Sequence, residues 1–136
     1  MKAAGRFVPV VRTGNLVFVS GHVSGTGDDP VCGKAGADQT IERAYEGGRY
    51  VADALLATLE RELESLDRIA RIVKVLGFVN AAPDFTEMPA VINGVSERLI
   101  EVLGARGEHA RSAVGVASLP LGSTVEAELI AELREV

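Results

Sequence analysis

Residues 40–66 restrict the fold of this chain most strongly, because they read as one long amphipathic helix. Their apolar side chains recur at steps of three and four residues: Val51, Leu55, Leu59, Leu63 and Leu66. This spacing places them on one face of a helix, and that face must be covered by a sheet or by another helix. The pair Gly47–Gly48 weakens the first turns of the predicted helix.

Two further segments follow this helix. Residues 68–82 are almost continuously apolar and rich in Ile and Val, which predicts a central strand covered on both faces. Residues 90–104 return to helical spacing, and Gly104 is a suitable C-terminal stop for that second helix. The middle of the chain therefore predicts a helix, a strand and a second helix.

The two ends of the chain predict strands. Residues 6–11 and 15–23 are rich in β-branched residues and are separated by a turn at Gly14–Asn15, which predicts a hairpin. Residues 111–118 and 124–133 alternate in the same way. We expect them to form a second, antiparallel hairpin through the short sequence LPLGS.

The resulting order of elements predicts a single α+β domain over residues 1–136, with a mixed sheet and two helices packed on one face. The last predicted strand is apolar on one side and carries Glu126, Glu128 and Glu132 on the other. Two helices are too few to cover both faces of the sheet. We therefore expect oligomerisation to cover the second face.

Composition argues against several classes of function. The net charge is −5, with no run of Lys and Arg, which is unlike a nucleic-acid-binding protein. The single cysteine, Cys32, precludes an intrachain disulfide and favours the cytoplasm, and no apolar stretch approaches the length of a membrane span. His22 and His109 lie far apart in the sequence and have no clustered acidic partners, so we expect no metal site. The sequence also has no nucleotide-binding fingerprint, so we expect no other cofactor.

Arg111 most strongly suggests a functional site. Strand alternation places it on one face with Ala113, Gly115 and Ala117, so that a guanidinium adjoins a floor of small residues. In the predicted hairpin, Gly115 lies opposite Glu126 on that same face. The guanidinium can then hold a carboxylate while the glutamate positions or deprotonates a water. The open alternative is a structural Arg–Glu pair at a subunit interface, where the small residues only permit close packing.

Several motifs resemble those of one protein family. The segment ARSAVGVASLPLGSTVEAEL, which starts at Ala110, resembles the C-terminal signature of the RidA/YjgF family of imine and enamine deaminases. The segment VRTGNLVFVSGHVS resembles the Gly-Asn turn, apolar strand and Ser-Gly element of that family. VKVLGFVN and INGVSERL resemble its central strand and second helix, so the resemblance covers nearly the whole chain.

The resemblance implies a chorismate-mutase-like subunit that forms a homotrimer with ligand clefts between neighbouring subunits. It implies that Arg111 binds the carboxylate of the substrate and that Glu126 assists the water that attacks the imine carbon, without a cofactor. Gly21 and Asn93 match positions that line the pocket of the family.

Three pocket positions depart from the family pattern. Phe7 replaces a tyrosine, His22 replaces a common glutamine and Ala113 replaces a common cysteine. We expect a hydrolytic deaminase that converts 2-imino or 2-enamine carboxylic acids into 2-oxo acids and ammonia. The alternative is a non-catalytic trimer that binds a small carboxylate metabolite, which the loss of polar lining at two positions favours. A ribonuclease fits the negative net charge less well.

Overall fold

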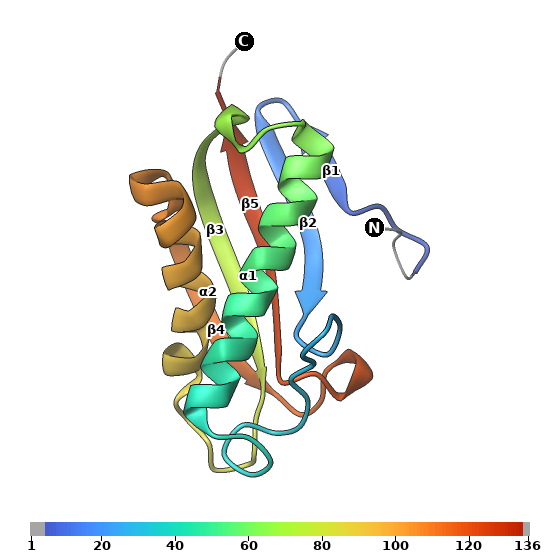
Figure 1. The fold of residues 1–136 in the computed structure, drawn as a ribbon, viewed down its shortest axis with the longest axis vertical. Coiled ribbons are helices and arrows are strands. Elements are labelled where there is room, and N and C mark those ends of the chain that lie inside the picture. Colours follow the sequence, from blue (N-terminus) through green and yellow to red (C-terminus); the bar gives the residue numbers. More distant parts are fainter. Residues whose placement is uncertain (1–4, 135–136) are drawn as a thin grey trace.

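The computed structural model describes residues 5–134, which form a five-stranded sheet with two long helices on one face (Figure 1). The strands are β1 (Val10–Thr13), β2 (Leu16–Val23), β3 (Ile69–Asn80), β4 (Ala110–Val116) and β5 (Val125–Leu133). The helices are α1 (Ile41–Leu63) and α2 (Met88–Leu103), and three short 3-10 turns join elements of the fold. The predicted α+β class, with a mixed sheet and both helices on one face, is confirmed.

Helix α1 has the boundaries of a capped amphipathic helix. The Thr40 hydroxyl accepts a hydrogen bond from the backbone N–H of Arg43 at 3.1 Å, which satisfies one of the unpaired donors of the first turn. The helix ends at Glu64, which has a left-handed backbone with φ of 72°. It runs without interruption through Gly47 and Gly48, so the weakness expected in its first turns is overcome by tertiary packing.

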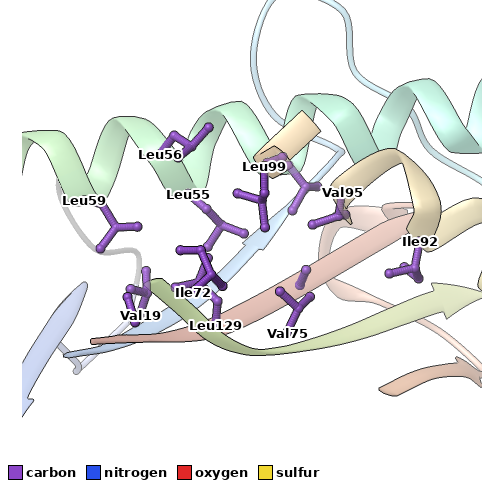
Figure 2. Packing of buried hydrophobic residues seen from close by; sticks show 14 of the residues in the cluster. Val19, Leu55, Leu56, Leu59, Ile72, Val75, Ile92, Val95, Leu99 and Leu129 are labelled. Carbon is purple, nitrogen blue, oxygen red and sulfur yellow. The ribbon is translucent and has the colours of Figure 1, made fainter. Parts of the chain in front are cut away.

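The hydrophobic core lies between the two helices and the sheet. The apolar faces of α1 and α2 meet the inward-facing side chains of β2, β3 and β5, as Figure 2 shows. Its central members include Val19, Leu55, Leu59, Ile72, Val75, Leu99 and Leu129. Full burial of a side chain of this size contributes about 1.5–3 kcal/mol, so this layer is the main source of stability.

The two helices approach closely at a pair of glycines. A Cβ on Gly94 of α2 would overlap the carbonyl oxygen of Tyr45 and lie 3.2 Å from the backbone nitrogen of Arg49. A Cβ on Gly48 of α1 would lie 3.1 Å from the carbonyl oxygen of Val91. These contacts are with backbone atoms, which cannot rotate away as a side chain can. Gly94 is therefore required for the close approach of the helices, whereas Gly48 leaves room for a methyl group only in tight contact.

Gly94→Ala is expected to destabilise the fold by about 1–3 kcal/mol or more, because the methyl group forces the two helix backbones apart. Gly48→Ala is the matched control: its Cβ fits more nearly, and alanine favours a helix over glycine by about 0.5–1 kcal/mol. Urea unfolding followed by circular dichroism should give a clearly larger loss for Gly94→Ala. A Gly94→Ala variant as stable as wild type would contradict the close crossing.

The strand order is β1-β2-β5-β3-β4, which confirms one predicted hairpin and shows that the other is wrong. β1 and β2 pair antiparallel across Gly14–Asn15, as predicted. β4 does not pair with β5; it lies parallel to β3 at the edge of the sheet, and β5 is inserted between β2 and β3. The LPLGS sequence thus carries the chain past the end of β3 rather than around a tight turn.

The pairing of β4 follows from the connection that precedes it. Helix α2 runs between β3 and β4, and a helical crossover of this kind joins parallel neighbouring strands. The long apolar β3 then has its second edge available for β5, which pairs with it antiparallel along most of its length. Turn residues alone could not reveal this, because they mark a reversal of the chain without specifying its partner strand.

The face of the sheet opposite the helices is uncovered in the described chain. β5 directs Glu126, Glu128, Ile130 and Glu132 to this open face, as predicted, while its alternate residues are buried. The large apolar residues Val11, Phe18 and Val114 are exposed, and Leu76, Phe78 and Ile130 are only half-buried. The prediction that residues 68–82 are covered on both faces therefore holds within one chain only for the helix side.

Candidate functional site

Arg111 lies at the start of the edge strand β4 and points to the helix side of the sheet. Its Nη1 atom donates hydrogen bonds to Asn93 Oδ1 at 2.8 Å and to Ser96 Oγ at 3.2 Å, both on α2. Neither its Nε nor its Nη2 has a hydrogen-bond partner among residues 5–134, and no carboxylate lies within ion-pair distance. The guanidinium is thus held by neutral groups at one nitrogen, with its other edge unoccupied.

A histidine supports this cluster from the same strand region. His109 Nδ1 lies 2.6 Å from the carbonyl oxygen of Gly107, and Nε2 lies 2.9 Å from Ser96 Oγ. Burial lowers the pKa of His109 below 6.5, and the charge of Arg111 lowers it further, against the opposing effect of the Gly107 hydrogen bond. A shallow hollow of about 290 Å³ is lined by Ser96, Ile100, Glu108, His109 and Arg111.

The other residues on the face of β4 that carries Arg111 are small, but they do not line the hollow at Arg111, and Gly115 and Ala117 line the hollow at the other end of the strand. Ala113 is half-buried and packs against the core, and Gly115 is opposite Val79 with room for little more than a methyl group beside Met88. These residues share the face of Arg111 because side chains alternate along β4. Nothing bulky from β4 therefore obstructs the approach of a small ligand to the guanidinium.

Glu126 lies on the open face near the start of β5, beside a bulge in β2. The register between β2 and β5 shifts between Val19 and His22, so that Ser20 and Gly21 form the extra segment. A Cβ on Gly21 would overlap Glu126 Oε2 and lie 3.2 Å from its Cδ. Gly21 therefore contacts the carboxylate through its backbone, at a position where any side chain would displace that carboxylate.

The environment of Glu126 makes its carboxylate a stronger base than an exposed glutamate. Partial burial raises its pKa above 4.5, and the charge of Glu128 on the same face raises it further. No hydrogen-bond partner of the Glu126 side chain occurs within residues 5–134. The carboxylate therefore has lone pairs available for a water.

The predicted meeting of Arg111 and Glu126 on one face is wrong. Glu126 of β5 is opposite Val23 of β2 and Phe78 of β3. Gly115 belongs to β4, where it is opposite Val79 of β3, and β4 does not pair with β5. Arg111 faces α2, and Glu126 faces away from both helices. The sheet separates the two groups because their side chains point to opposite faces, and β3 also lies between their strands. Within one subunit they cannot hold the same small molecule, so any site or ion pair that includes both groups would have to join two subunits.

His22 and Phe7 lie in different surroundings from each other. His22 is buried on the helix side, where Nε2 is 2.8 Å from the Thr58 hydroxyl of α1 and Nδ1 is 2.8 Å from the Ser20 carbonyl. Burial lowers its pKa below 6.5. Phe7 is 53% exposed, and the next residue, Val8, accepts a hydrogen bond from the Ser20 hydroxyl at 2.8 Å. Phe7 thus precedes a segment tied to the Gly21 bulge, whereas both ring nitrogens of His22 are engaged within the subunit.

A second hollow, of about 480 Å³, lies at the opposite end of β4 from Arg111. Phe85 and Met88 form part of its apolar wall, and the Lys34 ammonium at its side donates to Asn80 Oδ1 at 2.9 Å. Its lining lacks the combination of a guanidinium and an acid. For the described part of the chain, no cluster of metal-ligating side chains occurs and no helix is long and apolar enough to cross a membrane.

Sequence reasoning missed Ser96 as a partner of Arg111. The signal was present in two spacings: Asn93 and Ser96 are three residues apart on one helix face, and His109 and Arg111 are two residues apart on one strand face. What the sequence lacked was the parallel pairing that brings this strand face against α2.

Comparisons with known proteins agree with the arrangement of these elements. The family model described as Endoribonuclease L-PSP matches residues 1–133. Protein TCP17 of Trypanosoma cruzi is 38% identical over 134 residues, which cover 96% of this chain and 83% of that protein.

Two solved structures share the fold. The crystal structure of Atu1372 from Agrobacterium tumefaciens is 39% identical, with a TM-score of 0.91 over 95% of this chain and 83% of that chain. The crystal structure of RidA from the Antarctic bacterium Psychrobacter sp. PAMC 21119 is 26% identical, with a TM-score of 0.63 over 97% of this chain and 92% of that chain. This chain therefore shares its fold with both of these proteins.

Proposed function

Because this chain belongs to the Endoribonuclease L-PSP family, also called RidA/YjgF, we propose that it hydrolyses 2-imino and 2-enamine carboxylic acids without a cofactor. The products are a 2-oxo acid and ammonia. The proposed enzyme is a cytoplasmic homotrimer, and its substrate is a small carboxylate metabolite. The single cysteine and the uncovered apolar face support the location and the assembly, respectively.

The observation that carries this proposal is the unoccupied edge of Arg111. Asn93 and Ser96 occupy both hydrogens of Nη1, so the parallel N–H groups of Nε and Nη2 remain for a ligand. This pair of donors matches the two oxygens of a carboxylate. Since the partners of Arg111 are neutral, its positive charge is available to the ligand rather than neutralised within the subunit.

We propose that each site is shared between two subunits, because the sheet separates Arg111 from Glu126 within one subunit. One subunit supplies Arg111 and Asn93, with Ala113 beside them. Its neighbour supplies Glu126 with the Gly21 backbone. The edge strand β4 and the open face of a second copy are the surfaces that such a contact would join, and Phe18 and Val114 supply apolar area for it.

In the proposed mechanism, the carboxylate of the substrate binds the Nε–Nη2 edge of Arg111. The Glu126 carboxylate accepts a proton from a water as the water oxygen attacks the imine carbon. The imine nitrogen takes up that proton, which gives a carbinolamine. The proton of the new hydroxyl group then passes to the nitrogen, the carbon–nitrogen bond breaks, and ammonia leaves as the 2-oxo group forms. Since these imines also react with bulk water, orientation of the two reactants can supply several kcal/mol of barrier lowering without a nucleophile.

The family description names an endoribonuclease, and this chain is poorly suited to RNA. Its net charge is −5, whereas RNA binding depends on a surface that attracts phosphates. Among residues 5–134, the hollow at Arg111 is lined by Glu108 and by no other Lys or Arg, so it is not part of a basic track. A small carboxylate is the ligand that this arrangement fits better.

Mixed trimers provide the test of a shared site. Arg111→Ala and Glu126→Gln subunits, each inactive alone, are co-expressed with different affinity tags and purified through both tags. Each mixed trimer then contains one site with an intact Arg111 from one subunit and an intact Glu126 from the other. We expect 2-oxo acid release to return in the mixed trimers.

The readout is the release of a 2-oxo acid from 2-iminopropanoate generated in situ by an amino-acid oxidase, corrected for spontaneous hydrolysis. Light scattering should give about three times the subunit mass of 14.3 kDa. Mixed trimers as inactive as the parent variants would contradict the shared site. A monomer at micromolar concentration would contradict the assembly itself.

A further inference from the structure

Arg111 is the end of a chain of four hydrogen-bonded groups that begins at a backbone carbonyl. The chain runs from Gly107 O to His109 Nδ1 at 2.6 Å, from His109 Nε2 to Ser96 Oγ at 2.9 Å, and from Ser96 Oγ to Arg111 Nη1 at 3.2 Å. Three of its members come from the segment 107–111 and one from α2. This series of hydrogen bonds therefore links the start of β4 to helix α2.

The direction of each hydrogen bond in this chain follows from its two ends. The Gly107 carbonyl oxygen can only accept, so His109 carries its proton on Nδ1. In the neutral ring Nε2 is then an acceptor, and the Ser96 hydroxyl must donate to it. Arg111 can only donate, so a lone pair of Ser96 Oγ receives its Nη1 hydrogen. Every donor meets an acceptor, and no other arrangement of the neutral ring satisfies both ends.

This direction matters for the guanidinium. A serine hydroxyl rotates freely and can present either its hydrogen or a lone pair to a neighbour. By accepting the Ser96 hydrogen, His109 keeps that hydrogen away from Arg111 and turns a lone pair toward Nη1. Asn93 fixes the second hydrogen of Nη1, so the plane of the guanidinium is set and its Nε–Nη2 edge is presented in one direction.

The charged groups around His109 do not supply another partner for its ring. Arg111 lies on the same strand side, and Glu108 also lines the hollow but makes no ion pair within the described residues. From α2, the groups that line the hollow are Ser96 and Ile100, which are uncharged. Protonation of the ring would place a second positive charge beside Arg111 and turn Nε2 into a donor toward Ser96, which reverses the chain.

We propose that His109 is a positioning residue that acts through Ser96 to orient Arg111 for carboxylate binding, and that it requires its Nδ1-protonated, neutral tautomer. This inference rests on the proposed function, because it assigns a role in the carboxylate site. Arginine has a long side chain with large rotamer entropy, and holding it in the bound orientation beforehand lowers the entropic cost of binding a ligand.

The affinity test uses pyruvate as the probe and isothermal titration calorimetry on the trimer. Ser96→Ala and His109→Phe should each raise the Kd by roughly 5- to 30-fold, the scale for losing one oriented hydrogen bond near a charge. The double variant should be no weaker than the weaker single variant, because both act on the same group. Ser96→Thr retains the hydroxyl and should bind within about threefold of wild type.

Thr58→Val is the matched control for these variants. It breaks the other buried histidine–hydroxyl pair, between Thr58 and His22, and keeps the volume of the side chain. It should lower the melting temperature and leave the Kd for pyruvate unchanged. Ser96→Ala and His109→Phe variants that bind pyruvate as tightly as Thr58→Val does would overturn the role of His109.

A second measurement does not depend on ligand binding. ¹⁵N NMR of the histidine rings in the ligand-free protein should show His109 with a proton on Nδ1 and none on Nε2 at pH 7.5. A proton on Nε2 would overturn the inference whatever the affinities. If wild type binds no small carboxylate, the proposed function fails, and the role of His109 in binding fails with it even when the tautomer is as expected.

Discussion

Arg111→Ala is expected to weaken the binding of pyruvate by about 10²-fold or more, because two charge-assisted hydrogen bonds to the carboxylate are lost together. The fold should tolerate this change. Arg111 has only neutral partners, Asn93 and Ser96, and no buried carboxylate is left without its counter-ion when the guanidinium is removed. Calorimetric titration and thermal melting of the same sample measure both quantities.

Arg106→Ala is the matched control for Arg111→Ala. Arg106 is also a half-buried arginine, and its Nη1 donates to the backbone carbonyls of Leu66 and Ile69 at 3.1 and 2.8 Å. Its loss leaves those carbonyls without their partner, so the melting temperature should fall while the affinity for pyruvate is unchanged. A large loss of stability with unaltered affinity in Arg111→Ala would instead assign Arg111 a structural role.

Glu126→Gln is expected to reduce turnover of 2-iminopropanoate by about 10²-fold or more, since the amide retains the shape of the carboxylate but cannot accept a proton from water. The affinity for pyruvate should change little, because the carboxylate of the ligand is held by Arg111. Initial rates of 2-oxo acid release, with spontaneous hydrolysis subtracted, measure the effect. Unchanged turnover in this variant would exclude Glu126 as the base.

The pH dependence of turnover supplies a control on the same strand. Burial and the charge of Glu128 raise the pKa of Glu126 above 4.5, and the base works only when ionised. Activity should therefore fall as the pH decreases through this raised pKa. Glu128→Gln removes one of the two causes, so the pKa of Glu126 should drop and the acid limb should move to lower pH, with turnover at pH 7.5 retained.

Arg111→Ala and Glu126→Gln together also distinguish an enzyme from a binding protein. A trimer that only binds a carboxylate metabolite would lose affinity in Arg111→Ala, as an enzyme would. It would show no hydrolysis faster than water in wild type and no rate effect in Glu126→Gln. This comparison is informative because Phe7 and Ala113 stand where the family pattern has a tyrosine and a cysteine.

The local elements of this fold could be predicted because their causes are local. The stripe from Val51 to Leu63 specifies a helix by its period, and Gly14–Asn15 closes the first hairpin. The alternation along β5 assigned its two faces correctly. In each case the residues that determine the structure lie within a few positions of one another, so they can be read from a short window of sequence.

The partner of β4 could not be predicted in this way. Residues 111–118 and the LPLGS turn were compatible with a hairpin, yet the crossover through α2 and the long free edge of β3 determined a parallel pairing. That choice depends on which edges of the sheet are available once the helices have packed. It reverses the environment of Arg111, which then faces α2 and not Glu126.

The sequence by itself therefore determined the elements, the class of fold and the family, and it nominated Arg111 and Glu126 as candidates whose chemistry suits a carboxylate and a water. Only the tertiary structure decided that they face opposite sides of the sheet, that Ser96 and His109 support the guanidinium, and that Gly21 contacts the acid. The physical reason is that side-chain chemistry is a property of each residue, whereas convergence on one site depends on strand pairing between segments distant in the chain.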